Sequence, residues 1–149
     1  MRQMRKLVRG LPIRRFASGA LIQNSIEEVL LVEPTYKPDW EIPGGRGRPY
    51  ESTRRACRRE LQEELGLKIE LGRCLVADLK QVDGAPIDHF IFDGGILAEE
   101  EITSIRLPPP ELRSYRFVPR LKIGPPMVSD RLARRIGRAL DALEADASD

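Results

Sequence analysis

The sequence predicts a single α/β domain, and two observations lead to that class. Two helical patterns are interspersed with short apolar segments typical of strands, an order found in α/β proteins. The chain has 149 residues, of which 41% are hydrophobic, so it can bury one core and is expected to fold. We therefore expect one domain over residues 14–145, a basic arm over residues 1–13 and a frayed tail over residues 146–149.

The first part of the chain predicts a hairpin and a glycine turn. Residues 16–23 and 27–33 are apolar segments separated at residues 24–25, which favours two strands joined by a tight turn. Residues 40–42 form a third, short strand candidate. This candidate runs into residues 43–45, where two consecutive glycines allow a backbone turn that residues with side chains resist.

The next part of the chain predicts a well-delimited helix. Ser52 is a favourable N-cap and Gly66 a favourable stop, so we expect a helix from about residue 53 to residue 65. Apolar residues at three- or four-residue intervals then predict a second, amphipathic helix near the C-terminus. The remaining expected elements are strands near residues 68–79 and 87–97, an irregular loop over 98–114, a strand over 115–118 and the amphipathic helix over 129–143.

Three glutamates stand on one face of the first predicted helix. Glu60, Glu63 and Glu64 are spaced i, i+3 and i+4, so their carboxylates are expected to converge. Like charges at this spacing repel one another, and we find no counter-charge at i±4 strong enough to balance them. Mg²⁺ prefers carboxylate oxygens, so the pattern predicts a divalent cation at this face.

The glutamates belong to a longer motif of fixed spacing, G-x5-E-x7-R-E-U-x-E-E-x-G-U, in which U is aliphatic. Seven fixed identities would coincide by chance at roughly one start position in 10⁸. The motif is the Nudix box, and the chain resembles the Nudix hydrolase family, which is MutT-like. The resemblance implies an α/β/α sandwich with a mixed β-sheet. The fixed positions are Gly45, Glu51, Arg59, Glu60, Glu63, Glu64 and Gly66, with Leu61 and Leu67 in the aliphatic slots.

The resemblance also implies a reaction, which is hydrolysis of a diphosphate linked to some other moiety X. The enzyme would act on acid anhydrides in phosphorus-containing compounds and would need Mg²⁺, for which Mn²⁺ could substitute. Glu60 and Glu64 are the first choice for direct metal ligands, together with the backbone carbonyl of Gly45. Glu63 is either a further ligand or the base that takes a proton from water.

Arg59 and Glu51 are expected to act through the glutamates. They are eight residues apart, about two helical turns, so their side chains can meet on one side. The resemblance implies an ion pair that clamps the loop to the helix and orients the catalytic carboxylates. The alternative is a surface salt bridge, which contributes little free energy.

Other site candidates lie outside the fixed positions. Arg46 and Arg48 make the loop of the box unusually basic and are candidates to contact substrate phosphate, although exposed loop arginines are an equal alternative. Tyr36 could stack on a nucleobase or simply lie at the rim. Glu111 is the best-placed remote acid to complete the metal site, against the alternative of a solvated loop acid. His89 is expected to pack or hydrogen-bond in a strand.

The expected substrate is a small nucleoside diphosphate derivative. The alternative is a catalytically weak Nudix domain that senses a nucleotide, and a diphosphate isomerase ranks lower because its extra cysteine and glutamate machinery is not evident. The net charge of +2 does not argue for stable nucleic-acid binding. No apolar run reaches membrane-spanning length and no signal peptide is evident, so a cytoplasmic protein is expected, and a homodimer is left open.

Overall fold

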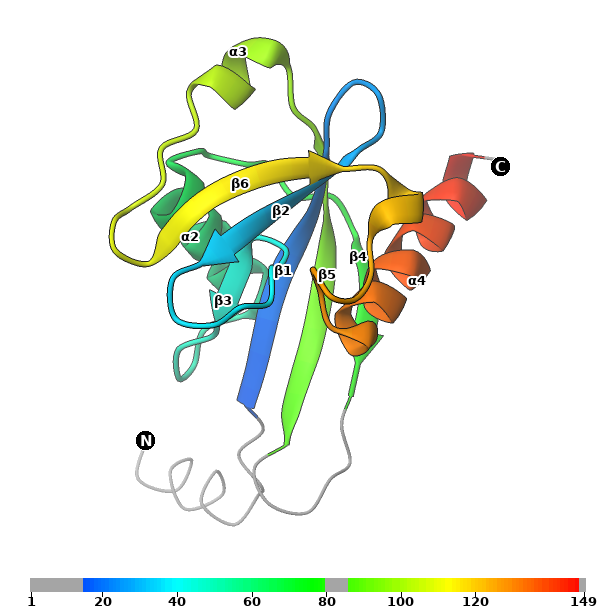
Figure 1. Cartoon of the computed structure of the whole chain (residues 1–149). Helices are drawn as coiled ribbons and strands as arrows, with labels where there is room; N and C mark the ends of the chain where they lie inside the picture. The colour runs from blue at the N-terminus through cyan, green and yellow to red at the C-terminus, as the bar shows by residue number, and fades with distance from the viewer. Residues whose placement is uncertain (1–14, 80–85, 148–149) are drawn as a thin grey trace, which may run out of the picture.

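A mixed β-sheet organises the molecule (Figure 1). The computed structural model describes residues 15–79 and 86–147, and within them the sheet has six strands. Their order is β4-β5-β1-β2-β6, with β3 paired to β1 beside this path. β1 runs parallel to β5, and every other pair is antiparallel. The strands are β1 Arg15–Gln23, β2 Val29–Pro34, β3 Gly44–Arg46, β4 Cys74–Asp78, β5 Ile87–Ile96 and β6 Leu112–Val118.

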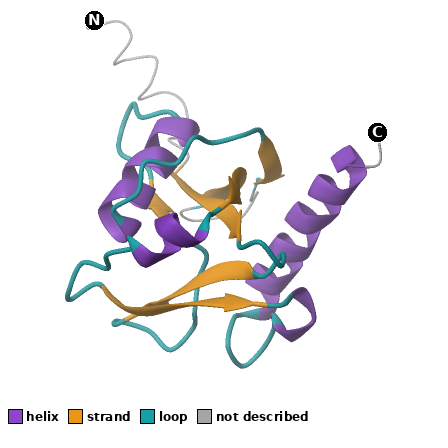
Figure 2. Ribbon diagram, turned by 90° about the horizontal axis from the view of Figure 1, so that it is seen from above, coloured by secondary structure: helices purple, strands orange, loops and turns teal. Residues whose placement is uncertain are grey.

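Two helices cover opposite faces of this sheet, as Figure 2 shows. They are α2, residues Thr53–Leu65, and α4, residues Asp130–Ala147. The alternation of side chains along β1 explains the layers, because Ile22 packs in the cluster on the α2 side and Leu21 in the cluster on the α4 side. The expected α/β class and sandwich arrangement are confirmed.

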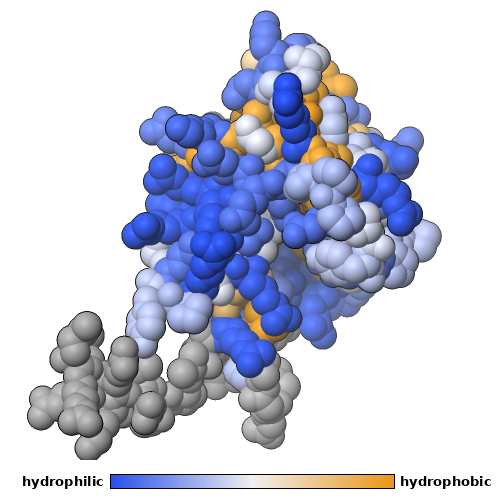
Figure 3. Space-filling model, turned by 90° about the vertical axis from the view of Figure 1, so that its left-hand side faces the viewer, coloured by the Kyte–Doolittle hydropathy of each residue, from blue (hydrophilic) through white to orange (hydrophobic). Residues whose placement is uncertain are grey.

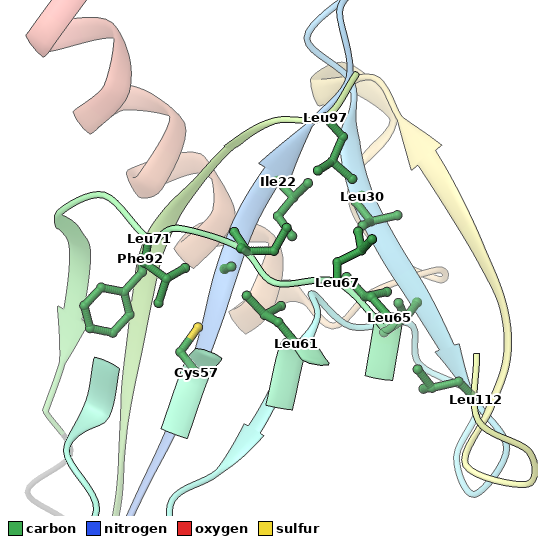
Figure 4. Packing of buried hydrophobic residues seen from close by; sticks show 13 residues of the cluster. Ile22, Leu30, Cys57, Leu61, Leu65, Leu67, Leu71, Phe92, Leu97 and Leu112 are labelled. Atoms are coloured by element: carbon green, nitrogen blue, oxygen red, sulfur yellow. The ribbon is translucent and has the colours of Figure 1, made fainter. Parts of the chain in front are cut away.

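The helix α2 matches the sequence expectation at both ends. The Ser52 side chain accepts a hydrogen bond from the Arg55 N–H at 3.1 Å, and Gly66 ends the helix with φ 70°. Leu61 and Leu65 are fully buried and lie among the side chains of β1 and β2 in Figure 4. The opposite side of α2 is polar, and the molecular face that carries it is largely hydrophilic (Figure 3).

The glycine segment is a strand and not the expected turn. β3 occupies residues Gly44–Arg46, whereas the proposed strand over residues 40–42 is reduced to a single bridge between Glu41 and Val32. Glycine allows this pairing, because a Cβ added at Gly44 would lie 2.3 Å from the Ser18 carbonyl oxygen. Just beyond β3, the Gly47 N–H donates to the Phe16 carbonyl at 3.0 Å.

The segment over residues 98–114 is also more regular than expected. It contains the short helix α3, Glu99–Thr103, and the first residues of β6. A run of acids favours the helix start, where the Glu101 carboxylate accepts from the Ala98 N–H at 3.0 Å. Conversely, β4 is shorter than the predicted strand over residues 68–79.

The C-terminal helix is longer than the sequence suggested. α4 continues to Ala147, and the side chain of Asp146 pairs with Arg73 at 2.5 Å, which holds this end against the chain that leads into β4. Arg120, in the 3₁₀ turn η1 (Arg120–Lys122), pairs with Asp141 at 2.6 Å. The basic arm over residues 1–13 lies outside the described residues. Among the helices that are described, none is both long and apolar enough to cross a membrane.

Candidate active site

The strand β3 and the helix α2 meet at two glycines. The Gly44 N–H donates a hydrogen bond to the Glu64 carboxylate at 3.0 Å. A Cβ added at Gly45 would lie 2.6 Å from Glu60 Oε2, so only glycine lets this carboxylate approach the backbone so closely. Two of the three helix glutamates therefore lie against the backbone of one short strand.

Arg59 links the loop that precedes α2 to the helix itself. Its guanidinium grips the Glu51 carboxylate with two hydrogen bonds, Nε to Oε2 at 2.8 Å and Nη2 to Oε1 at 2.9 Å. Nη2 also donates to the Arg46 carbonyl at 3.1 Å, and Nη1 donates to Glu60 Oε1 at 2.8 Å. Glu51 accepts a further bond from the Arg48 N–H at 2.9 Å. These bonds hold the pKa of Glu51 down at about 2, with the Arg59 hydrogen bond the largest cause.

The third glutamate, Glu63, is more exposed than the other two and shares Arg59 with Glu60. The Glu63 side chain is half exposed, and its carboxylate lies 3.3 Å from Arg59 Nη1 and 3.6 Å from Arg48 Nη2. The expectation that no positive charge balances the glutamates was therefore wrong. Arg59 stands four residues before Glu63 and next to Glu60 in the chain, and it contacts both carboxylates.

Burial raises the pKa values of the Glu60 and Glu64 carboxyls. It raises the pKa of Glu64 to about 8, where the Gly44 N–H opposes the shift and Glu60, Glu41 and Glu111 add to it. Burial also raises the pKa of Glu60, against the opposing effect of Arg59. The remote candidate Glu111 thus acts on both carboxyls, although its own side chain is exposed.

Glu41 is a site acid that the sequence analysis missed. Its charge raises the pKa values of Glu64 and Tyr36, and its carboxylate pairs with Lys37. The only available signal was its place three residues before Gly44, within a segment expected to be a strand.

The carboxylates of Glu60 and Glu64 suit a hard divalent cation, although they do not form a complete set of metal ligands. Within residues 15–79 and 86–147, no group of three His, Cys, Asp or Glu side chains is arranged to hold a metal ion. Nevertheless Glu60 and Glu64 offer oxygen donors beside the backbone of Gly44 and Gly45, and burial and neighbouring acids disfavour their charged forms. A cation at this point would relieve that repulsion, so the donor set fits Mg²⁺ or Mn²⁺.

A cleft of about 590 Å³ opens beside β3. Its walls come from β1, β3, β5, the start of α4 and the loop after β2. Of the sequence candidates, Tyr36 and Arg46 line it, whereas Arg48 lies near Glu63. His89 also lines the cleft and has an interaction partner. Trp40, which the sequence analysis did not single out, adds an aromatic wall.

Comparison with known proteins identifies the family. A model of the NUDIX domain matches residues 13–140. The chain belongs to the Nudix family. The CTP pyrophosphohydrolase of Escherichia coli (strain K12) is 31% identical over 107 residues, which cover 68% of this chain and 77% of that protein. The family resemblance is thus confirmed, and this Nudix protein is a hydrolase of acid anhydrides in phosphorus-containing compounds.

Solved structures support the same fold. The MutT protein from Methanosarcina mazei Go1 superposes with a TM-score of 0.70 at 22% identity, covering 91% of this chain and 98% of that one. A UDP-X diphosphatase superposes with a TM-score of 0.74 at 18% identity, covering 97% of this chain and 71% of that one.

Proposed function

We propose that this Nudix hydrolase is a Mg²⁺-dependent pyrophosphohydrolase that cleaves the diphosphate linkage of a nucleoside diphosphate joined to another moiety X. The observation that carries the proposal is the meeting of Glu60 and Glu64 with the Gly44–Gly45 backbone at the edge of a roomy cleft. Bound Mg²⁺, or Mn²⁺ in its place, would neutralise diphosphate charge and make an attacking water more acidic.

The residues of the site take different roles in this proposal. Glu60, Glu64 and the Gly45 carbonyl hold the cation. Glu63 is half exposed and lies near Arg59 and Arg48, and its carboxylate accepts a proton from water or serves as a further ligand. Arg59, fixed by Glu51, orients Glu60 through a 2.8 Å hydrogen bond.

The nucleoside part of the substrate belongs in the cleft. Trp40 and Tyr36 offer aromatic surface there, and Arg46 places a positive charge next to the strand β3. Glu111 completes the acidic set from the turn before β6. The relative named a CTP pyrophosphohydrolase supports a nucleotide derivative as the substrate, and no membrane or stable nucleic-acid partner is needed for this reaction.

The test is a turnover assay with a panel of substrates. CTP, oxidised nucleoside triphosphates, ADP-ribose and sugar nucleotides are each incubated with the purified protein and Mg²⁺. Released products are treated with phosphatase and the phosphate is measured. We expect hydrolysis of at least one class, loss of turnover after dialysis against chelator, and recovery with Mg²⁺ or Mn²⁺.

Two results would contradict the proposal. Full activity in chelator would remove the metal from the mechanism. Tight binding of a nucleotide without any turnover would favour a sensor, although all the glutamates of the box are present in this chain.

A further inference from the structure

The helix α4 carries a basic face that the proposed reaction does not use. Arg131, Arg134, Arg135 and Arg138 are spaced over two turns on one side of the helix. With Asp78 and Asp130 they line a second hollow of about 510 Å³. Four arginines against two aspartates leave this hollow a formal charge of +2.

Two of these arginines have no partner within residues 15–79 and 86–147. Arg134 pairs with Asp130 at 2.5 Å, and Arg135 Nε donates to Asp78 at 2.8 Å. Among the residues that the structure describes, Arg131 and Arg138 have no hydrogen bond or ion pair, and both side chains are exposed. Their charges are therefore available to an anion.

Arg135 distinguishes this hollow from an ordinary solvated helix face. The residue is only 7% exposed, and its Nη2 is buried without a hydrogen-bond acceptor. Burying a guanidinium donor unpaired is costly, so a chain that retains it is expected to gain something from it. A ligand could supply the acceptor that Arg135 Nη2 lacks, after a small shift of the Arg135 side chain.

The hollow borders the cleft. Arg131 and Arg135 line both cavities, so a molecule that fills the cleft from β3 to α4 ends beside these two arginines. A substrate held there by its diphosphate at Glu60 and Glu64 would place its far end beside these arginines.

We propose that this basic face selects substrates that carry a phosphate monoester in addition to the diphosphate linkage. The inference rests on the proposed function, because it assigns the far end of the same substrate. Arginine is well suited to such a group, since its planar fork pairs with phosphate oxygens through charge-assisted hydrogen bonds.

Matched substrates test the proposal directly. NADP⁺ differs from NAD⁺, and coenzyme A from dephospho-coenzyme A, by one phosphate monoester. We expect the wild-type protein with Mg²⁺ to show a KM lower by about tenfold or more for the phosphorylated member of a pair. The exposed double variant Arg131→Ala/Arg138→Ala should lose that preference.

The control separates a local contact from a general loss of positive charge. Arg106 is exposed and lies beside Gly66 at the end of α2, on the opposite side of the sheet from α4. Arg106→Ala should keep the preference. Equal KM values for both members of each pair in the wild-type protein, or an undiminished preference in the double variant, would overturn the inference.

A binding measurement keeps the inference independent of turnover. Calorimetric titration with adenosine 3′,5′-bisphosphate and with AMP needs no hydrolysis. Tighter binding of the bisphosphate that is lost in the double variant supports the inference. If, in addition, no substrate of the panel is hydrolysed, only the proposed function fails. Equal binding of the two nucleotides overturns it, and so does binding of a single-stranded RNA oligonucleotide in place of the bisphosphate.

Discussion

Arg59 is the residue on which the geometry of the candidate site depends. It contacts the Glu51, Glu60 and Glu63 carboxylates and the Arg46 carbonyl, so one side chain connects the loop, the strand β3 and the helix. The energy of such a network is not divisible among its members, since removal of one partner leaves the others misplaced. The main role of Arg59 is therefore to position the carboxylates that it contacts, more than to supply charge.

The Glu51–Arg59 pair should therefore behave as a unit in kinetics. Glu51→Ala and Arg59→Ala should each lower kcat, and the double variant should be little worse than either single variant. Steady-state rates of the three proteins measure this coupling. Arg58→Ala, an exposed neighbour on the same helix, serves as the control and should keep the wild-type rate. Losses in kcat that simply multiply would show that the two residues act separately.

Glu63 and Glu64 should prove essential for the reaction but not for the fold. Glutamine preserves their shape and removes their charge, so Glu63→Gln and Glu64→Gln should each lower kcat by about 10²-fold or more. Circular dichroism should show an unchanged fold, because the glutamine oxygen at position 64 can still accept from the Gly44 N–H. Glu70→Gln, an exposed acid, is the control. Near-normal rates in both variants would refute the catalytic assignment.

At the residue scale, the sequence predicted contacts between residues that are close in the chain. The contact between Glu51 and Arg59 was expected and the structure has it, although Glu51 lies in the loop before α2 and not on the helix. The position of Arg59 between Glu60 and Glu63 was missed, since its rotamer depends on the fold of the loop. Glu41 was missed because its charge acts on Glu64 from a distant segment of the chain.

At the scale of elements, the sequence predicted the ends of a helix correctly where capping residues mark them. The helix α2 was predicted with its bounds because Ser52 and Gly66 mark its ends. The strand β3 was not, because glycines lack strand propensity and this pairing depends on β1 lying alongside. The short helix α3, Glu99–Thr103, was not predicted because it is only about one turn long, too short to show a helical period.

The clamp between the loop and α2 should weaken in acid. The pKa of Glu51 is about 2 in the folded protein against an ordinary 4.5, so its contribution to stability is complete above pH 4.5 and is lost as the pH falls through about 2. Glu51→Gln lacks this titration. The wild-type protein should exceed the variant in unfolding free energy by on the order of 1–3 kcal/mol at pH 7.

Urea unfolding followed by circular dichroism at several pH values measures that difference. The gap between the two proteins should narrow steadily from pH 4.5 toward pH 2. A gap of constant size over this range would mean that the carboxylate charge of Glu51 does not stabilise the clamp.

At the scale of the whole molecule, charge is distributed unevenly around the acidic site. Arg46 lines the cleft and Arg48 lies beside Glu63, so both add positive potential where an anionic substrate would arrive. Neither side chain contacts Glu64 or its backbone partner. Attraction of the substrate is thus assigned to Arg46 and Arg48, although Arg48 also lies 3.6 Å from the Glu63 carboxylate.

Removal of these two charges should affect binding more than turnover. Arg46→Ala/Arg48→Ala should raise KM several-fold at low salt and change kcat less, and the effect should shrink as ionic strength screens charges beyond about 10 Å. Kinetics at low and high salt measure it. Arg55→Ala/Arg58→Ala, on the exposed side of α2, removes equal charge as a control. An unchanged KM at low ionic strength would exclude both loop arginines from substrate attraction.

The close approaches at the glycines also determine where this enzyme can change. An added Cβ would lie 2.5 Å from the Glu60 side chain at Gly45 and 1.9 Å from the Phe16 ring at Gly47, so a substitution at either position requires the neighbouring side chain to move. Between and beyond them Arg46, Arg48 and Tyr50 are exposed. A library randomised at these three positions should retain folded, metal-competent members. Natural or laboratory selection can therefore vary the end of β3 and the loop between β3 and α2, including Arg46 in the cleft wall, while the glycines and glutamates beside it stay constant.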